Sequence, residues 1–133
     1  MNIFSDLNIN FKDPPKPPNW INDNIKFFGP YLAGVIDSDG SVCIKRPKYP
    51  QCKIKIISGH PQYNLKESIE KNLKCKVAIE DSGKIMQYTG KWYPGFDLVF
   101  LVSSKNLKII KEYVLPFITI PRKRNIIKRY IEN

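Results

Sequence analysis

Hydrophobic side chains lie on nearly every side of the segment from Phe27 to Asp37. A segment of this length that is apolar all round predicts a buried helix. Pro30 suits the first helical turn, where an amide hydrogen bond is not needed. Gly40 follows shortly afterwards and is predicted to break the helix.

Two strands are predicted after this helix, over residues 41–48 and 51–58, joined around Pro50. In the second strand charged and apolar side chains alternate, in the order Lys53, Ile54, Lys55, Ile56. Successive side chains of a strand point to opposite faces of the sheet. We therefore expect one apolar face packed on helices and one cationic face in water.

The middle of the chain predicts a second helix and two further strands. Pro61 opens the helix, and apolar residues recur in it at every fourth position, namely Leu65, Ile69 and Leu73. Residues 75–81 and 96–103 have the composition of strands. The stretch between them, 83–95, is interrupted by glycines and fits either an extended hairpin or an irregular loop.

Two helices are predicted at the end of the chain. Ser104 is suited to cap the first of them, and Pro116 ends it. Pro121 lies in the first turn of the last helix. The predicted order is helix, two strands, helix, two strands, helices, which is an α+β fold with helices on one face of an antiparallel sheet.

The length of 133 residues favours one compact domain. Residues 1–24 carry four closely spaced prolines, so we expect a tail or clasp there, and the folded domain is predicted over 25–133. The longest apolar run, 98–102, is far shorter than the roughly 20 residues that cross a membrane.

The formal net charge is +10 at pH 7 and the isoelectric point is near 9.6. The first 30 residues hold three lysines and three aspartates, so the whole excess lies after them. A surplus this large on a small domain favours polyanions, because neutralised phosphates release condensed counterions. The charge therefore points to nucleic acid as a partner.

The cysteine pattern excludes two kinds of structural site. The three cysteines form no CxxC pair, and the single histidine, His60, is distant from Cys43 and Cys75 in sequence. Neither a disulfide framework nor a zinc site is predicted. Reduced thiols and the lack of a signal-peptide core point inside a cell. The abundance of Asn, Lys and Ile fits an AT-rich genome, such as that of a mitochondrion or chloroplast, and a prokaryotic cytoplasm is the other expected location.

Asp37 and Asp39 fall at the C-terminal end of the first helix, where the unpaired carbonyls already make the field negative. Two acids at this end oppose stability, and a bound divalent cation would relieve the cost. A calcium loop fails on register, because with Gly40 sixth the first ligand would be Val35 and the twelfth Arg46. The alternative is that both acids cap and turn the chain.

The segment from Leu32 to Ser41, Leu-Ala-Gly-Val-Ile-Asp-Ser-Asp-Gly-Ser, resembles the signature of the LAGLIDADG homing endonucleases. It differs from the nine-letter name only at the fourth and seventh positions. The order of elements from about Asn24 onward also resembles the α-β-β-α-β-β-α core of that family. The chain holds one copy of the motif.

The resemblance implies a homodimer in which two motif helices pack in parallel, with Ala33 and Gly34 allowing the backbones to approach. It also implies that Asp39 binds the catalytic divalent ion, usually Mg²⁺ with other ions such as Mn²⁺ possible in its place, and that Ser38 lends its backbone carbonyl. Asp37 matches the earlier acid of the motif, which we interpret as mainly structural. The expected reaction is hydrolysis of both strands of double-stranded DNA at a specific site.

Family enzymes also place a basic residue near the start of a late helix, close to the scissile phosphate. Arg122, Lys123 and Arg124 occupy that region, and Lys123 is our first choice for catalysis, although Pro121 disturbs the register. Relatives carry a polar residue at the end of the second strand. Here Ser58 is nearest and Gln62 is next.

The cationic face is predicted to contact the DNA. Strands of about eight residues reach roughly 26 Å, or about eight base pairs, so two subunits would cover about 16 to 20 base pairs of a pseudo-palindromic site. Lysines of such a face can donate to guanine, and glutamine can pair with adenine. The residues expected to bind DNA are Lys45, Tyr49, Gln51, Lys53, Lys55, Lys76, Arg122 and Arg124.

Two other functions remain open. A non-cutting nucleic-acid-binding protein of the same fold, such as an RNA maturase that assists intron splicing, would bind intron RNA. A basic structural or ribosome-associated protein would show neither dimerisation through the motif helix nor dependence on metal.

Overall fold

The computed structural model describes residues 17–45, 49–86, 90 and 92–132. Its elements in chain order are α2 (Asn19–Asn22), α3 (Ile25–Asp39), β1 (Gly40–Lys45), β2 (Gln51–Ser58), α4 (Tyr63–Leu73), β3 (Ala78–Met86), β4 (Trp92–Val102), α5 (Leu107–Ile109), the π turn η1 (Ile110–Val114), the 3-10 turn η2 (Leu115–Phe117) and α6 (Pro121–Glu132).

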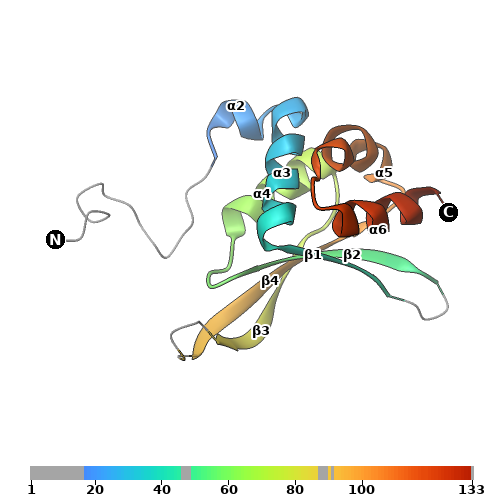
Figure 1. Cartoon of the computed structure of the whole chain (residues 1–133). Helices are drawn as coiled ribbons and strands as arrows, with labels where there is room; N and C mark the ends of the chain where they lie inside the picture. Colours follow the sequence, from blue (N-terminus) through green and yellow to red (C-terminus); the bar gives the residue numbers. More distant parts are fainter. Residues whose placement is uncertain (1–16, 46–48, 87–89, 91, 133) are drawn as a thin grey trace.

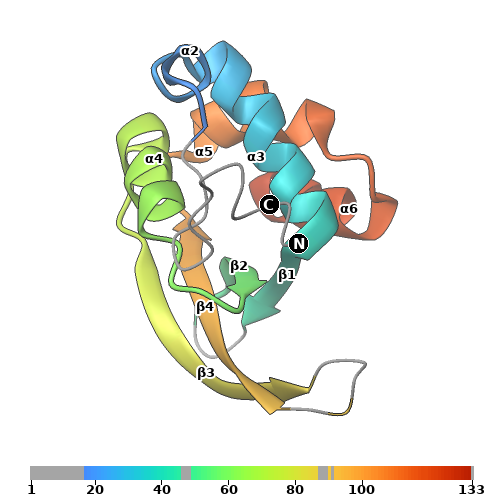
Figure 2. The same cartoon turned by 90° about the vertical axis from the view of Figure 1, so that its left-hand side faces the viewer.

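The four strands form one antiparallel sheet in the order β1-β2-β4-β3. All helices lie on one side of it (Figure 1), and the long β3–β4 hairpin curves away from the body of the molecule (Figure 2). The predicted α+β architecture is therefore confirmed. Within the described residues no helix packs against the other face of the sheet, which we call the open face.

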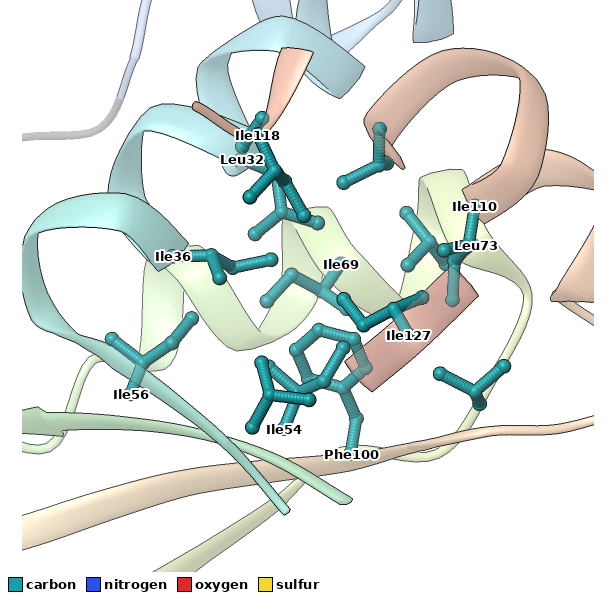
Figure 3. Packing of buried hydrophobic residues seen from close by; sticks show 14 of the residues in the cluster. Leu32, Ile36, Ile54, Ile56, Ile69, Leu73, Phe100, Ile110, Ile118 and Ile127 are labelled. Carbon is teal, nitrogen blue, oxygen red and sulfur yellow. The ribbon is translucent and has the colours of Figure 1, made fainter. Parts of the chain in front are cut away.

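The apolar and charged side chains of β2 lie on opposite faces of the sheet, as the sequence predicts. Ile54 and Ile56 are fully or almost fully buried, whereas Lys53 and Lys55 are half-buried on the open face. The core lies between sheet and helices and is built from α3, α4, η1, α6 and the inner side of the strands (Figure 3). Fully burying an aliphatic side chain contributes about 1.5 to 3 kcal/mol, so this layer fixes which face stays open.

The stretch 83–95 is a hairpin, which the sequence left undecided. β3 and β4 continue to pair out to Met86 and Trp92. The register shifts between Asp81 and Gly83, and Gly83 has a φ of +83°, which a glycine adopts without steric cost. The glycine therefore marks an irregularity inside a strand and does not end it.

The first helix differs from the prediction at its start. It begins at Ile25, two residues before Phe27, and Asn24 caps it by accepting a hydrogen bond from the Lys26 amide at 3.0 Å. Pro30 is consequently inside the helix and not in its first turn. The only bond that Pro30 cannot make is to the carbonyl of Lys26, an exposed residue near the helix end, where solvent can replace it.

The cap predicted at Ser104 is wrong. The helical segment begins at Leu107, and Asn106 occupies the N-cap position. The Asn106 side chain is fully buried, accepts from the Ser103 amide at 2.8 Å and donates to the Leu101 carbonyl at 2.8 Å. The Asn106 side chain thus satisfies two backbone groups at the end of β4, and it makes no capping hydrogen bond to the helix that follows.

Of the proposed N-terminal tail, residues 1–16 lie outside the described residues. Residues just before the domain form α2, in which Ile21 packs against the core and Asn22 is buried. The Asn22 carboxamide oxygen accepts from the Ser68 hydroxyl, and Lys71 pairs with Asp23, so α2 is bound to α4. None of the helices in the described part of the chain is long and apolar enough to cross a membrane.

Candidate functional site

The end of α3 is set by Gly40. Its amide donates to the Ile36 carbonyl and closes the helix. A Cβ at this position would lie 2.7 Å from that same carbonyl oxygen, so only glycine fits the turn. β1 starts at the same residue, and the last residues of α3 therefore lie at the junction between the helix and the edge of the sheet.

Asp37 is bound to the chain ahead of α6. Its carboxylate accepts from the Thr119 amide at 2.9 Å, the Thr119 hydroxyl at 2.9 Å and the Ile120 amide at 3.1 Å. Burial by itself would raise the pKa of Asp37, but these hydrogen bonds and the charge of Lys123 together lower it below its ordinary value. Asp37 is thus held as a carboxylate by groups from the far end of the chain.

Lys123, in the first turn of α6, also binds the end of α3. Its ammonium donates to the Ile36 carbonyl at 2.7 Å and to the Asp37 carbonyl at 2.9 Å. These carbonyls belong to the last turn of a helix, where a cation compensates the negative end of the dipole. We call the five contacts that join α3 to the start of α6 the helix-end clasp.

Asp39 differs from Asp37 in having no such partner. It is exposed, and its carboxylate makes no hydrogen bond or ion pair with the residues that the structure describes. Ser38 is also exposed, and its hydroxyl donates to the Val35 carbonyl at 3.2 Å. Two acids two residues apart therefore have different surroundings, one enclosed in the clasp and one open to a ligand.

No group of three or more potential metal-ligating side chains occurs within the described residues. One copy of the chain offers, at this place, the Asp39 carboxylate and backbone carbonyls. Mg²⁺ commonly takes one or two carboxylates and completes its shell with waters and substrate phosphates. The oxygen donors present fit such an ion if substrate or a second copy supplies the remainder.

The open face changes in charge along the strands. Nearest to the end of α3, Glu80 and Asp97 lie directly opposite each other, in the row of Ile57. The following rows carry Lys55 and then Lys53, moving towards the β1–β2 connection. Like charges directly opposite each other are unfavourable in a sheet, so the Glu80–Asp97 pair favours a partner that donates hydrogen bonds or carries positive charge.

The remaining predicted residues are spread over this junction and this face. Ser58 ends β2 beyond the row of Gly40, and its hydroxyl accepts from the His60 amide at 3.2 Å. Gln62 precedes α4 and is partly exposed. Tyr49 is 74% exposed beside the β1–β2 connection. On α6, Arg122 and Arg124 are exposed on either side of Lys123.

The two small residues of the motif have opposite surroundings. Ala33 is fully buried in the core of its own chain, whereas Gly34 is exposed, with open space where a Cβ would lie. Gly34 shares the exposed side of α3 with Phe27 and Tyr31, which are 50% and 37% exposed. The spacing 27, 31, 34, 38 gives this surface and could have been read from the sequence.

The sequence analysis missed two residues that position the site. A Cβ at Gly29 would lie 2.0 Å from the Tyr113 carbonyl oxygen, so this glycine lets η1 pack against α3. Thr119 contributes two bonds to the clasp. Neither has a local signal, because both act on residues that are remote in sequence.

No protein-family model matches this chain, and no curated protein sequence matches it. Its fold is similar to that of the LAGLIDADG meganuclease I-AabMI in a crystal structure bound to uncleaved DNA, with a TM-score of 0.53 and 21% sequence identity. The similarity covers 77% of this chain and 35% of that one, so this chain spans about a third of the length of its structural neighbour. At this identity the likeness establishes a shared fold.

Proposed function

We propose that this protein is a site-specific DNA endonuclease that acts as a homodimer and uses a divalent cation, Mg²⁺ or in its place Mn²⁺, to hydrolyse both strands of a duplex. The observation that carries the proposal is the contrast between the two acids at the end of α3. Asp37 is enclosed by the clasp, and Asp39 is exposed and unpaired among the described residues beside the open sheet face.

The chemistry fits this arrangement. When bound, a magnesium ion supplies neutralisation of the charge that develops on the phosphate and a water of lowered pKa. Asp39 would ligate the ion through its carboxylate, with the Ser38 carbonyl as a further donor. Lys123 holds the helix end that carries both groups. Ser58 and Gln62, at the same end of the sheet, are our candidates for ordering the water.

A second copy would meet the first across the exposed side of α3. Phe27 and Tyr31 supply apolar area there, and Gly34 allows close approach of two backbones because no side chain occupies the space. The Ala33 methyl group belongs to the core of its own chain, so its part in a dimer would be to keep α3 close to the sheet. Two Asp39 residues would then lie near the twofold axis, one for each DNA strand.

The open face would lie on the duplex. Its lysines neutralise phosphates or donate to guanine, and Gln51 can pair with adenine. Glu80 and Asp97 can accept from cytosine N4. The proposed DNA-binding residues on the sheet and its ends are Lys45, Tyr49, Gln51, Lys53, Lys55 and Lys76, with Arg122 and Arg124 on phosphates near the clasp.

The test is cleavage by the purified full chain. A library of duplexes with randomised sites of about 20 base pairs is incubated with Mg²⁺, with Mn²⁺, and with Ca²⁺ as the control that supports binding without hydrolysis. We expect discrete double-strand cuts only with the first two ions, and a dimer by sedimentation. A monomer on its substrate would refute the proposal. Metal-independent binding to structured RNA that is tighter than to any duplex would refute it in favour of the RNA-binding alternative.

A further inference from the structure

A concave site lies at the end of the open face away from Asp39. It has a volume of about 830 Å³ and is bounded by the loop between α4 and β3, the end of β4 and the start of β2. Four lysines line it: Lys53, Lys74, Lys76 and Lys105. We call this concavity the lysine pocket. We infer that it binds the sugar-phosphate backbone of the duplex outside the region covered by the paired strands, an inference that rests on the proposed DNA binding.

The pocket has a strong excess of positive charge. Against four ammonium groups it holds one carboxylate, Glu80. None of the four lysines forms an ion pair with a described residue, since the pairs that the structure shows are Lys66–Glu70 and Lys71–Asp23. Lys74, Lys76 and Lys105 are exposed at the rim. Positive charge gathered in a concavity and not neutralised by the protein attracts an anion.

The floor of the pocket is not charged. It includes Val99 and Leu101 on β4, and the hydroxyls of Ser103 and Ser104 lie at its end. An apolar floor beside cations and hydroxyls suits a group with both kinds of surface. A nucleotide unit has this character, because its phosphate accepts hydrogen bonds and its sugar presents carbon-bound hydrogens. A free inorganic ion would leave the apolar area in water.

The sheet register leads directly into the pocket. Lys53 pairs with Leu101 in the sheet, and the pairing of β3 with β4 ends at Ala78 and Val99. Lys76 precedes that last pair by two residues and lines the pocket. Lys74 is further back along the chain, at the end of α4, and lines the same pocket. These two lysines therefore lie outside the paired part of β3 and line the same pocket as Lys53. A duplex lying along the strands would reach them after leaving the sheet.

The backbone at Lys74 gives an independent reason to assign this site a function. Lys74 follows the last residue of α4 with a φ of +53°, and among the described residues it is the only one other than glycine with a positive φ. Glycine is the residue favoured at such a helix end, because a Cβ there is sterically strained. The chain therefore carries a lysine at a position where glycine would give a more stable fold, and residues held in strained conformations cluster at ligand-binding sites.

The test uses the opposite effects expected on stability and on binding. Lys74→Gly relieves the strain and removes one cation, so we expect Tm to rise by about 2 to 4 °C. For a duplex of about 24 base pairs, the logarithm of the affinity falls with the logarithm of the salt concentration, and we call the steepness of this fall the salt slope. In the same variant the salt slope should be smaller by about 0.9. At 0.15 M salt this corresponds to about fivefold weaker binding.

Two further variants distinguish the effect of the lysine pocket on binding from the effect of the protein's overall positive charge. Lys105→Gln leaves the backbone unchanged and should reduce the slope as Lys74→Gly does. Lys108→Gln removes an exposed lysine of α5 that does not line the pocket, and it should leave the slope unchanged. On a central duplex of about 10 base pairs, which ends before the pocket, Lys74→Gly and wild type should bind equally.

The outcomes are distinct. Wild-type protein that binds no duplex would refute the proposed function and, with it, this inference. Wild-type protein that binds duplex, together with a Lys74→Gly variant of unchanged slope, would refute the lysine pocket alone. An equal loss on the short and the long duplex would also refute it, because the lysine would then act only through the overall charge. Fluorescence anisotropy over a salt series, with the protein in its full length, supplies all of these measurements.

Discussion

The two ends of the open sheet face differ in charge and in how firmly they are held. The end beside α3 carries Asp39 and the Glu80–Asp97 pair, of which Glu80 also lines the lysine pocket, and we call it the acidic end. The end at the lysine pocket carries Lys53, Lys74, Lys76 and Lys105. A duplex along this face would be attracted at one end and repelled at the other. A cation at the acidic end would remove the repulsion, so the same contrast would account for the proposed affinity at one end and the proposed use of metal at the other.

The two ends also differ in precision. The helix-end clasp fixes the acidic end by contacts between segments more than 80 residues apart in sequence. The lysine pocket is lined by four long lysine side chains, three of them exposed, and has a strained backbone at Lys74. Hydrolysis requires ligands held within about half an ångström, whereas attraction of phosphates tolerates movement. Each end therefore has the construction that its proposed task requires.

The largest effect is expected for Asp39→Asn. The exchange keeps shape and removes the charge that would hold the ion, so cleavage at saturating DNA should fall at least about a thousandfold. Affinity for the duplex should stay the same or rise slightly, because a negative charge near the phosphates is lost. Single-turnover cleavage and anisotropy on the same preparation measure both. Equal losses of rate and affinity would mean that the two ends do not have separate tasks.

A smaller loss is expected when the clasp is opened and Asp39 is kept. Lys123→Met removes a charged donor to two carbonyls, and we expect about 1.5 to 3 kcal/mol lower stability. Misplacement of Asp39 should slow cleavage about 10-fold to 100-fold and raise the Mg²⁺ concentration that gives half the maximal rate. Duplex affinity should change little. Denaturant unfolding and a metal titration of the cleavage rate are the measurements.

Thr119→Val distinguishes positioning from direct participation of Lys123. It removes the hydroxyl bond, which is one of the three hydrogen bonds to Asp37, and leaves the two backbone donors and the ammonium group in place. If Lys123 acts by holding the end of α3, both variants should shift the Mg²⁺ requirement, and the double variant should lose less than the sum of the two. Lys123→Arg should restore part of the rate. A normal Mg²⁺ requirement in Thr119→Val, with Lys123→Met inactive, would assign Lys123 a direct catalytic contact.

The opposite result, weaker binding with an unchanged cleavage rate, is expected for a substitution of Lys55, in the middle of the open face. Lys55→Gln should weaken duplex binding about fivefold at 0.15 M salt and lower the salt slope by about 0.9 if the lysine contacts a phosphate. Cleavage at saturating DNA should be unchanged. If the lysine reads a base instead, the slope stays and the preference at one position of the site relaxes. A reduced maximal rate with normal affinity would contradict the proposed division of the face.

Much of the fold could be predicted from the sequence because its signals are local. The alternation around Ile54 and the apolar segment before Asp37 fix the two faces of the sheet and the buried helix, and the structure confirms both. The start of α3 and the cap of α5 were misplaced. Asn106 acts through backbone groups of the preceding strand end, and such contacts have no periodicity in the sequence.

The candidate site could be predicted only in part. The sequence locates two acids at a helix end and expects different roles for Asp37 and Asp39. It does not show that Thr119 and Lys123 return to that end from far along the chain. Lys74 was also missed, because its importance depends on a backbone angle that composition does not reveal. Which exposed residues bind metal or DNA stays a prediction.

The smallest expected effect is a change in the pH dependence of stability at the clasp. In the folded chain the pKa of Asp37 is lowered from its ordinary value of 3.8: burial acts to raise it, and the hydrogen bonds of Thr119 and Ile120 and the charge of Lys123 outweigh that effect. A carboxyl group of lowered pKa stabilises the fold above its unfolded pKa, and this contribution is lost as pH falls through the folded value. The difference in Tm between wild type and Asp37→Asn should therefore be constant above about pH 5 and shrink below 3.8. Comparing the two variants cancels the titration of the other carboxylates. A Tm difference that stays constant down to pH 3 would show that the clasp holds Asp37 equally well in its protonated form. The charge of Lys123 would then not stabilise the Asp37 carboxylate.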